Sequence, residues 1–197
     1  MIAATTFLWV RHGPTGVTGR HVGRTEVSAK LPEPARLGPL WDMLAEAGTF
    51  VSSPAARARQ TAGALFPGEM IAVEARLQEQ DFGEWEGRPH GETAMPEGLD
   101  AAGIAQFRPP GGESFAEVCA RTGRAIAALA GDHAGNTIAI VAHAGPIRAA
   151  LVHALASAPA SGIAFEVAPL SVTRISLFAG GGARIDYVNR QVVDLPV

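Results

Sequence analysis

An α/β fold, a three-layer α/β/α sandwich around a mostly parallel central sheet, is predicted by the order of hydrophobic patterns along the chain. Short apolar runs that suit buried strands alternate with segments of helical spacing, which is typical of parallel sheets covered by helices. The runs over 6–11 and 137–142 are almost wholly apolar, as strands buried on both faces are. The chain has 197 residues, 47% hydrophobic and 18% charged. It can therefore bury one core, and we expect a single domain over residues 1–197.

The N-terminal part of the chain predicts a strand, a long loop and a helix. Residues 6–11, TFLWVR, are apolar, aromatic and β-branched, which favours a buried strand. The next segment, 13–34, is rich in Gly, Pro and Thr and reads as a loop. Apolar residues then recur at helical spacing and predict a helix over 35–47. These residues are Leu37, Leu40, Trp41 and Leu44.

A second strand, helix and strand follow. TFVSSP at 49–54 predicts a short strand that leads into a helix start at Ser-Ser-Pro. The helix is expected over about 55–65, with Arg57 and Thr61 on one side because they are four residues apart. MIAVEARL, 70–77, has the composition of a strand.

Residues 78–113 are rich in Gly, Pro and acidic residues and predict an irregular excursion with one short helix near 98–106. Long irregular loops in compact domains are often functional, so we expect this segment to form a lid over one edge of the fold.

The C-terminal part restores regular structure. A helix over 114–130 has an apolar stripe, the strand 137–142 follows, and a helix over 146–156 comes next. Residues 171–179 and 183–188, which are separated by a run of glycines, predict a closing hairpin.

Composition excludes several classes of function. The net charge is −3 and no block of like charge occurs, which argues against a nucleic-acid-binding protein but permits a small anionic ligand. The single cysteine, Cys119, allows no intrachain disulfide and is expected to be a buried small residue. The first residues lack the pattern of a signal peptide, and no apolar run approaches the roughly 20 residues of a membrane span. We therefore expect a cytoplasmic protein without a membrane partner.

Two predicted strands end alike. The first runs into Arg11, His12 and a glycine, and the later one runs into His143, an alanine and a glycine. Ligands of open α/β sheets bind beyond the carboxyl ends of the strands. If the two strands are neighbours, the two histidines meet at one point and mark a pocket.

Five segments resemble successive motifs of one family. VRHGPTG, SSPAARARQTA, LQEQDFGEWEG, PPGGESF and IVAHAGPIRAAL occur in the order found in the histidine phosphatase superfamily, also called phosphoglycerate mutase-like, and span most of the chain. The resemblance implies the phosphoglycerate mutase-like fold. It also implies that His12 is the nucleophile that forms a phosphohistidine, that Arg11 and Arg57 hold the phosphate, and that Glu79 donates and accepts the proton.

The resemblance extends to further positions with some departures. His143 corresponds to the second histidine of the pocket, and the backbone N–H of Ala144 stands where the family usually has a glycine amide near the phosphate. Pro14 follows the first histidine motif where the family has Glu or Gln. Thr18 stands nearest to a missing asparagine and is expected to donate its hydroxyl to phosphate. His21 and Arg24 are further candidates to face the pocket.

Several acids compete with Glu79 in the same segment. The motif favours Glu79, whereas Asp81 and Glu86 are expected to bond backbone groups and shape the loop, and Glu84 is left without a role. Phe82 and Trp85 are expected to pack the loop onto the core, with a wall that stacks against a ligand as the alternative.

The residue types suit phosphoryl transfer. The transferring group is a dispersed anion, so catalysis depends on positioning and charge stabilisation. Arginine forks match phosphate oxygens two at a time, neutral imidazole is a nucleophile near pH 7, and one carboxyl group can protonate the leaving alkoxide and then deprotonate water. The arginines and histidines supply the positive charge, and no His-x-His cluster occurs, so we expect neither cofactor nor metal.

The expected function is metal-independent hydrolysis of a small phosphorylated metabolite. The motifs resemble the phosphatase branch of the family, and within it alpha-ribazole phosphatases and broad-specificity phosphatases. A phosphoglycerate mutase is the alternative enzyme, although the chain is short for the insertion typical of cofactor-dependent mutases. A catalytically silent protein that binds a phosphorylated ligand is the alternative of another class. We expect a monomer or homodimer.

Overall fold

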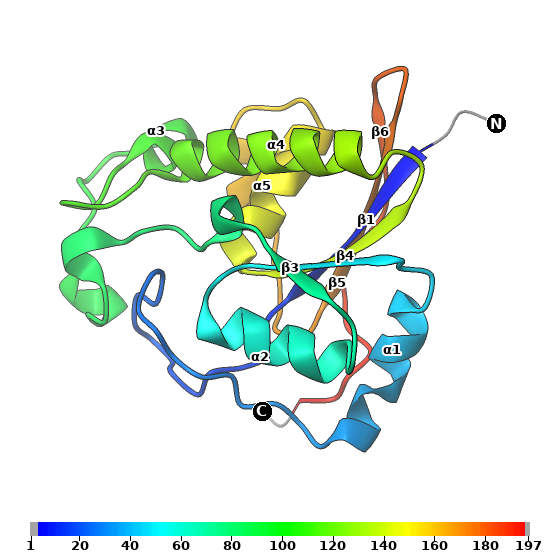
Figure 1. Cartoon of the computed structure of the whole chain (residues 1–197). Coiled ribbons are helices and arrows are strands. Elements are labelled where there is room, and N and C mark those ends of the chain that lie inside the picture. The colour runs from blue at the N-terminus through cyan, green and yellow to red at the C-terminus, as the bar shows by residue number, and fades with distance from the viewer. Residues whose placement is uncertain (1–3, 196–197) are drawn as a thin grey trace.

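The computed structural model describes residues 4–195 and shows one six-stranded sheet between two layers of helices (Figure 1). The strands in sheet order are β3 (Ile71–Val73), β2 (Thr49–Ser52), β4 (Thr137–Ala142), β1 (Ala4–Arg11), β5 (Val172–Phe178) and β6 (Ala183–Arg190). The first four strands are parallel, and β5 runs antiparallel to both β1 and β6. The mostly parallel sheet is confirmed, and the predicted hairpin extends it beside β1.

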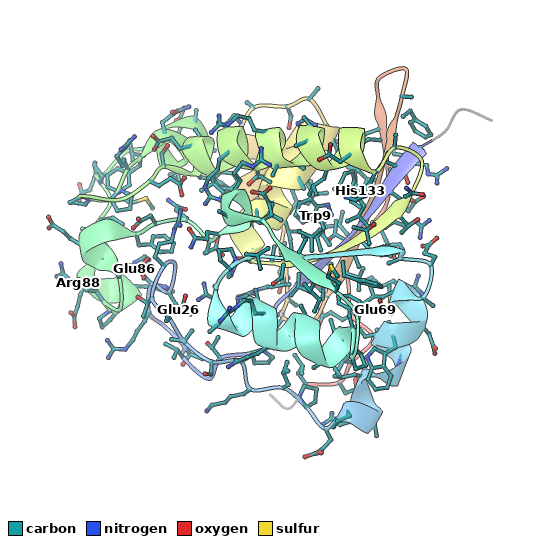
Figure 2. All side chains as sticks on the ribbon, in the orientation of Figure 1. Trp9, Glu26, Glu69, Glu86, Arg88 and His133 are labelled. Atoms are coloured by element: carbon teal, nitrogen blue, oxygen red, sulfur yellow. The ribbon has the colours of Figure 1, made fainter. Side chains whose placement is uncertain are left out.

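Helices cover both faces of the sheet, which confirms the three-layer sandwich. On one face lie α1 (Gly38–Leu44) and α2 (Ala56–Leu65), and on the other lie α4 (Phe115–Asp132) and α5 (Ala144–Ala154). The alternation along β1 explains both cores, because successive side chains point to opposite faces of a strand. Phe7 and Trp9 pack in the core with α4 and α5, whereas Leu8 and Val10 pack in the core with α1 and α2. Trp9 is 1% exposed and lies between the layers (Figure 2).

The predicted helices are present with shifted ends. The helix expected over 35–47 is a 3-10 turn over Pro34–Leu37 followed by α1, which ends at Leu44. The long helix α4 begins after Ser114, whose hydroxyl accepts a hydrogen bond from the backbone of Glu117 while the Glu117 carboxylate accepts one from the backbone of Ser114. This reciprocal cap satisfies donors that the helix itself leaves unpaired.

The remaining helices are short or begin earlier than expected. The helix predicted near 98–106 is α3 (Ala101–Gln106). The helix predicted over 146–156 begins two residues earlier, at Ala144. The short helix α6 (Ala160–Ile163) was not predicted.

The strand predicted over 70–77 is wrong beyond Val73. Residues Ala75–Leu77 form a 3-10 turn instead of strand. Glu74 explains the turn, because its carboxylate accepts hydrogen bonds from both the backbone and the guanidinium of Arg76. Acidic side chains that bond a backbone N–H two residues on favour turns over extended backbone.

The sheet topology places the functional residues. β1 and β4 are parallel neighbours, with Arg11 opposite Ala142, so both strands end at the same edge of the sheet. The loop 13–34 and the segment 78–113 lie side by side beyond this edge, at the left of the view (Figure 1). They are joined by hydrogen bonds from His21 N to Arg88 O and from Gly87 N to His21 O, of 3.0 and 2.8 Å. Within residues 4–195, no helix has the length and apolar character needed to cross a membrane.

Candidate active site

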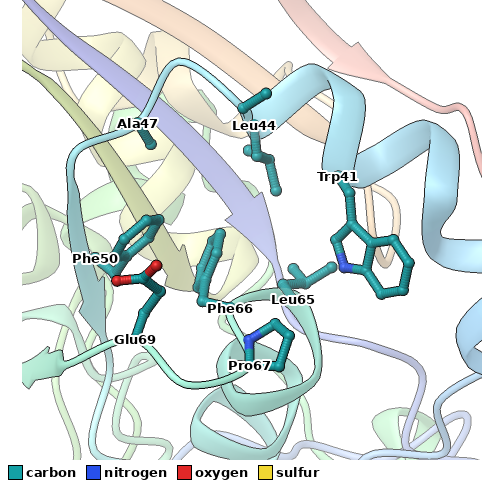
Figure 3. Close-up of a pocket in the computed structure, with 9 residues that line it drawn as sticks. Trp41, Leu44, Ala47, Phe50, Leu65, Phe66, Pro67 and Glu69 are labelled. Atoms are coloured by element: carbon teal, nitrogen blue, oxygen red, sulfur yellow. The ribbon is translucent and has the colours of Figure 1, made fainter.

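A polar cavity of about 350 Å³ lies beyond the carboxyl end of β1. It brings together Arg11 and His12 from the end of β1, Arg57 from α2, and Glu79, which come from three separate parts of the chain. A cavity of similar size, about 360 Å³, lies between α1, α2 and β2 and is lined mainly by apolar and aromatic side chains (Figure 3). The polar cavity is the one that can bind an anion, because it alone of the two is lined by arginines.

His12 is held as a neutral imidazole whose Nε2 is unprotonated. Its Nδ1 lies 2.7 Å from the carbonyl oxygen of Gly13, which only accepts, so Nδ1 carries the proton. Its Nε2 lies 3.2 Å from Arg57 Nε, which only donates, so Nε2 presents its lone pair. Burial, opposed by the bond to Gly13 and assisted by Arg57 and Arg11, lowers the pKa of His12 from 6.5 to about 3. The ring is therefore poised as a nucleophile at Nε2.

The two arginines are fixed by backbone carbonyls. Arg57 is 1% exposed and donates to Gly23 O at 2.7 Å and to Thr25 O at 3.1 Å. Arg11 donates from Nη1 to Val167 O at 2.6 Å, and its buried Nε has no hydrogen-bond partner among residues 4–195. Both guanidinium groups are therefore oriented before a ligand arrives, which lowers the entropy lost on binding.

The Glu79 carboxylate contacts the first turn of α5. Its Oε1 accepts hydrogen bonds from the backbone N–H groups of Gly145 and Gln80, at 3.1 and 3.0 Å. A residue larger than glycine at position 145 would displace the Glu79 carboxylate, because a Cβ there would lie 2.2 Å from Glu79 Oε1. Burial lowers the pKa values of Arg11 and Arg57, and the Glu79 carboxylate opposes that effect at both. The carboxylate is thus electrostatically coupled to both arginines.

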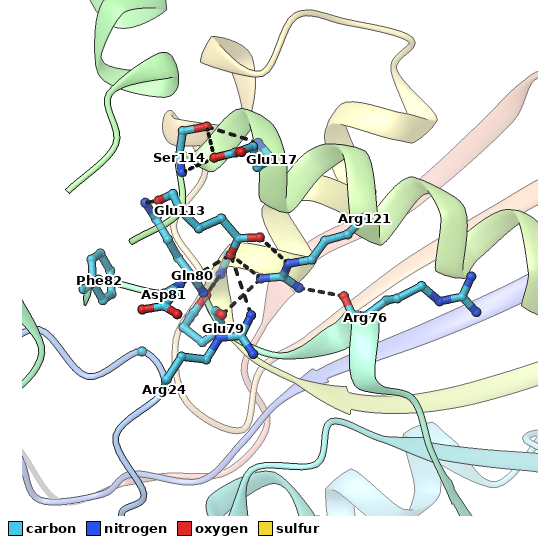
Figure 4. Close-up of polar contacts among 12 residues, drawn as sticks. Arg24, Arg76, Glu79, Gln80, Asp81, Phe82, Glu113, Ser114, Glu117 and Arg121 are labelled. Carbon is cyan, nitrogen blue, oxygen red and sulfur yellow. Dashed lines mark hydrogen bonds and ion pairs between the residues drawn. The ribbon is translucent and has the colours of Figure 1, made fainter. Parts of the chain in front are cut away.

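A largely buried ion pair between Arg121 and the half-buried Glu113 holds the backbone around Glu79. Arg121 of α4, 9% exposed, binds both carboxylate oxygens of Glu113 at 2.7 and 2.9 Å (Figure 4). The same guanidinium donates to the carbonyls of Arg76 at 2.6 Å and Glu79 at 3.0 Å. Bidentate charge-assisted bonds of this kind are short and directional. Arg121 therefore fixes the chain on both sides of the segment that carries the Glu79 carboxyl.

His143 lies against His12 but behind the cavity. The ring centroids are 5.0 Å apart with an interplanar angle of 64°, so the two predicted histidines do meet. His143 is 0% exposed, and its Nε2 lies 2.7 Å from Ser53 Oγ. Burial, with the nearby His12 and Arg57, holds the pKa of His143 well below its usual value. Ala144, where a phosphate contact was predicted, is the first residue of α5 and lies outside the cavity lining.

Three loop residues were candidates for this site, and the structure separates them. His21 lines the cavity. Thr18 is exposed and outside the lining, so the phosphate contact predicted for it has no support in this arrangement. Arg24 is turned toward the carboxylate of Glu113, 3.9 Å away, and does not line the cavity.

The neighbouring acids shape the loop, as predicted. Asp81 Oδ1 accepts a hydrogen bond of 2.8 Å from the backbone N–H of Gly83. Glu84 is exposed. Glu86 accepts from the backbone N–H groups of Gly23, Arg24, Thr25 and Phe82. Glu86 thereby ties the loop 13–34 to the segment 78–113.

Sequence reasoning missed several residues that line the cavity, among them Arg20, Arg148 and His90. Arg148 of α5 reaches it and donates from Nε to Phe165 O at 2.8 Å. Arg148 could have been predicted, because it lies one helical turn after Ala144 on a helix that begins at the site. His90 also lines the cavity and packs edge-on against His21, with centroids 4.5 Å apart. No local pattern marks His90, because its place depends on how the long segment folds back.

The sequence profile of the histidine phosphatase superfamily (branch 1) matches residues 7–191. The chain belongs to this superfamily. Among solved structures, this histidine phosphatase is similar to a mycobacterial glucosyl-3-phosphoglycerate phosphatase, with 26% identity, a TM-score of 0.84, and coverage of 95% of this chain and 100% of that one.

Two further similarities extend the comparison. The chain is 32% identical over 201 residues to a bifunctional protein of Mycobacterium tuberculosis, an alignment that covers 94% of this chain and 54% of that protein. It therefore spans about half the length of that curated relative. A proposed alpha-ribazole-5'-phosphate phosphatase of Escherichia coli is 20% identical with a TM-score of 0.79, over 98% of this chain and 100% of that one, and shares the fold.

Proposed function

We propose that this histidine phosphatase hydrolyses phosphate monoesters through a phosphohistidine formed at His12 Nε2. The observation that carries the proposal is the neutral, buried imidazole of His12, which lines a cavity with Arg11 and Arg57 and whose unprotonated Nε2 lies 3.2 Å from Arg57 Nε. Membership of the superfamily supports it, as does the similarity to a mycobacterial phosphatase of known structure.

The reaction follows from the arrangement of the side chains. His12 Nε2 attacks phosphorus, the P–O bond to the alcohol breaks, and the protonated carboxyl of Glu79 gives its proton to the leaving oxygen. Arg11, Arg57 and Arg148 hold the phosphoryl oxygens and neutralise their charge. The hydrogen bond from Nδ1 to the carbonyl of Gly13 disperses the positive charge of the phosphorylated ring.

Water then completes the cycle. The Glu79 carboxylate, left without a proton by the first step, accepts one from a water molecule that attacks phosphorus. The P–N bond breaks, inorganic phosphate leaves, and His12 returns to its neutral form with Glu79 again protonated. No cofactor or metal enters these steps. Among residues 4–195, no three His, Cys, Asp or Glu side chains gather closely enough to hold a metal ion.

The substrate proposed is a small phosphorylated metabolite, with alpha-ribazole phosphate as the specific candidate. Hydrolysis of alpha-ribazole phosphate with a higher kcat/KM than generic sugar phosphates supports this candidate, and equal or lower values refute it. A phosphoglycerate mutase is the alternative enzyme, and it requires isomerisation of phosphoglycerate that depends on a bisphosphorylated primer.

The decisive experiment traps the covalent intermediate. Enzyme quenched during turnover of a ³²P-labelled monoester should retain acid-labile, base-stable label, and His12→Ala should retain none. Turnover should continue in EDTA. Measurable affinity for the ester without any trapped label or released phosphate would favour a silent binding protein.

A further inference from the structure

A second, apolar chamber of about 210 Å³ adjoins the phosphate cavity. The two share His21, Phe82 and Arg148 as lining residues, so they form neighbouring compartments of one site. The chamber's own walls include Ile104 and Phe107 of the segment 78–113. An alcohol that carries the phosphate in the cavity can therefore extend from it beside these walls.

The walls are aromatic and almost free of charge. The ring of His21 lies 4.8 Å from that of Phe82 and 5.4 Å from that of Trp85, and Trp85 stacks on Phe107 at 5.3 Å and 30°. Among the residues that the structure describes, Arg148, at the junction with the phosphate cavity, is the only lining side chain with a fixed charge. Burial lowers the pKa of His21, and its Nε2 bonds Thr93 Oγ1 at 2.7 Å, so this ring adds a neutral face.

The chamber distinguishes substrates by whether the surface that their alcohol part buries is apolar or polar. A flat apolar ring gains about 25 cal/mol for each Å² of surface that it removes from water. The hydroxyls of a sugar lose their hydrogen bonds to water in this chamber and face mainly apolar and aromatic side chains. Burying a polar group without a hydrogen-bond partner is costly in free energy. Aromatic walls also favour a stacked ring beyond the area that it buries.

We infer that this chamber is the subsite for the alcohol part of the substrate and that it selects a flat, apolar or aromatic group over a polyhydroxylated one. The inference rests on the proposed function, because it takes the phosphate to lie at His12. It takes up the alternative given for Phe82 and Trp85, a wall that stacks against a ligand. Both line the chamber, as the alternative of a stacking wall required.

The test compares two esters of primary alcohols, 2-phenylethyl phosphate and glucose 6-phosphate, so that the bond broken is of the same type. The full chain should hydrolyse the phenylethyl ester with a kcat/KM at least about tenfold higher. Phe107→Ala and Ile104→Asn should each reduce that ratio several-fold. Phe50→Ala is the matched control, because Phe50 is a half-buried phenylalanine that lines the separate apolar cavity of Figure 3. It should leave the ratio unchanged.

Binding to the His12→Ala variant separates this inference from the proposed function. Calorimetric titration should show tighter binding of 2-phenylethyl phosphate than of glucose 6-phosphate even without chemistry. If the unsubstituted chain shows neither turnover nor trapped phosphohistidine while His12→Ala still prefers 2-phenylethyl phosphate, only the proposed function is refuted. Equal kcat/KM and equal Kd for the two esters, or a preference that both chamber variants leave intact in proteins with native circular dichroism, would overturn the subsite.

Discussion

Gly145→Ala offers a sharp test of the catalytic arrangement, because activity should fall far more than stability. A Cβ at residue 145 would lie 2.2 Å from Glu79 Oε1, whereas Cβ atoms essentially never approach other atoms within 3.0 Å. The carboxylate must therefore retreat by at least the difference, 3.0 − 2.2 = 0.8 Å. Because Oε1 is the end of a flexible side chain, it can move without disturbing the backbone.

The two effects have different magnitudes. Alanine in place of glycine favours a helix by up to about 1 kcal/mol, but the lost hydrogen bond from Gly145 N–H to Glu79 offsets that gain by about 1 kcal/mol or more. Tm should therefore stay the same or fall by roughly 2–4 °C in a chain of this size. A displacement of about 1 Å at a catalytic group can reduce the rate by ~10²-fold. The loss should be large for alkyl phosphates, whose leaving oxygen needs a proton, and small for p-nitrophenyl phosphate, whose leaving group does not.

The assay measures kcat/KM for both substrate types alongside the melting temperature. Gly63→Ala is the matched control, since Gly63 lies in α2 and a Cβ added there would have open space around it, with no described neighbouring atom within 4 Å. This variant should gain stability without losing activity. Unchanged hydrolysis of alkyl phosphates by Gly145→Ala would show that the position of Glu79 is not critical. Equal losses on both substrate types would exclude Glu79 as the proton donor.

Further predictions concern the same site. His12→Ala should abolish turnover while circular dichroism and cooperative unfolding persist; residual phosphohistidine-dependent hydrolysis would exclude His12 as the nucleophile. Glu79→Gln should slow alkyl phosphates about 10²- to 10⁴-fold and aryl phosphates with good leaving groups far less, as stopped assays of released phosphate would measure. Arg121→Met should leave Glu113 with only Arg24, at 3.9 Å, as an ion-pair partner and the carbonyls of Arg76 and Glu79 without this donor, and should destabilise by roughly 1–3 kcal/mol in urea unfolding; a change below about 1 kcal/mol would contradict the clamp. The pKa values of His12 and His143 lie below 6.5 in the folded state. Below pH 6.5 the unfolded chain therefore binds more protons at these two histidines than the folded chain does. Stability should therefore be full above pH 6.5 and fall between pH 6.5 and 5, by up to about 1.4 kcal/mol per pH unit for each histidine, with a shallower slope in His12→Ala.

Local sequence patterns were sufficient for the layers of the fold and for much of the site. The alternation from Phe7 to Val10 carries both cores, because the side-chain period of a strand is a local property. Two strands ending in histidine were enough to predict a shared edge, and β1 and β4 are indeed parallel neighbours. The strand predicted over 70–77 was wrong because the side chain of Glu74 competes for the backbone, an effect that hydrophobic composition does not register.

Only the tertiary structure decided how the chemistry is arranged. The position of Glu79 on the backbone of Gly145 and the Arg121 clamp depend on groups brought together by the packing of α4 and α5, and the contact of His12 Nε2 with Arg57 depends on the packing of α2. Hydrophobic spacing records which face of an element is buried, but it carries no information about which distant donor meets a given acceptor. That pairing is set by burial, since a charged or polar group removed from water must find its partner wherever the fold places one.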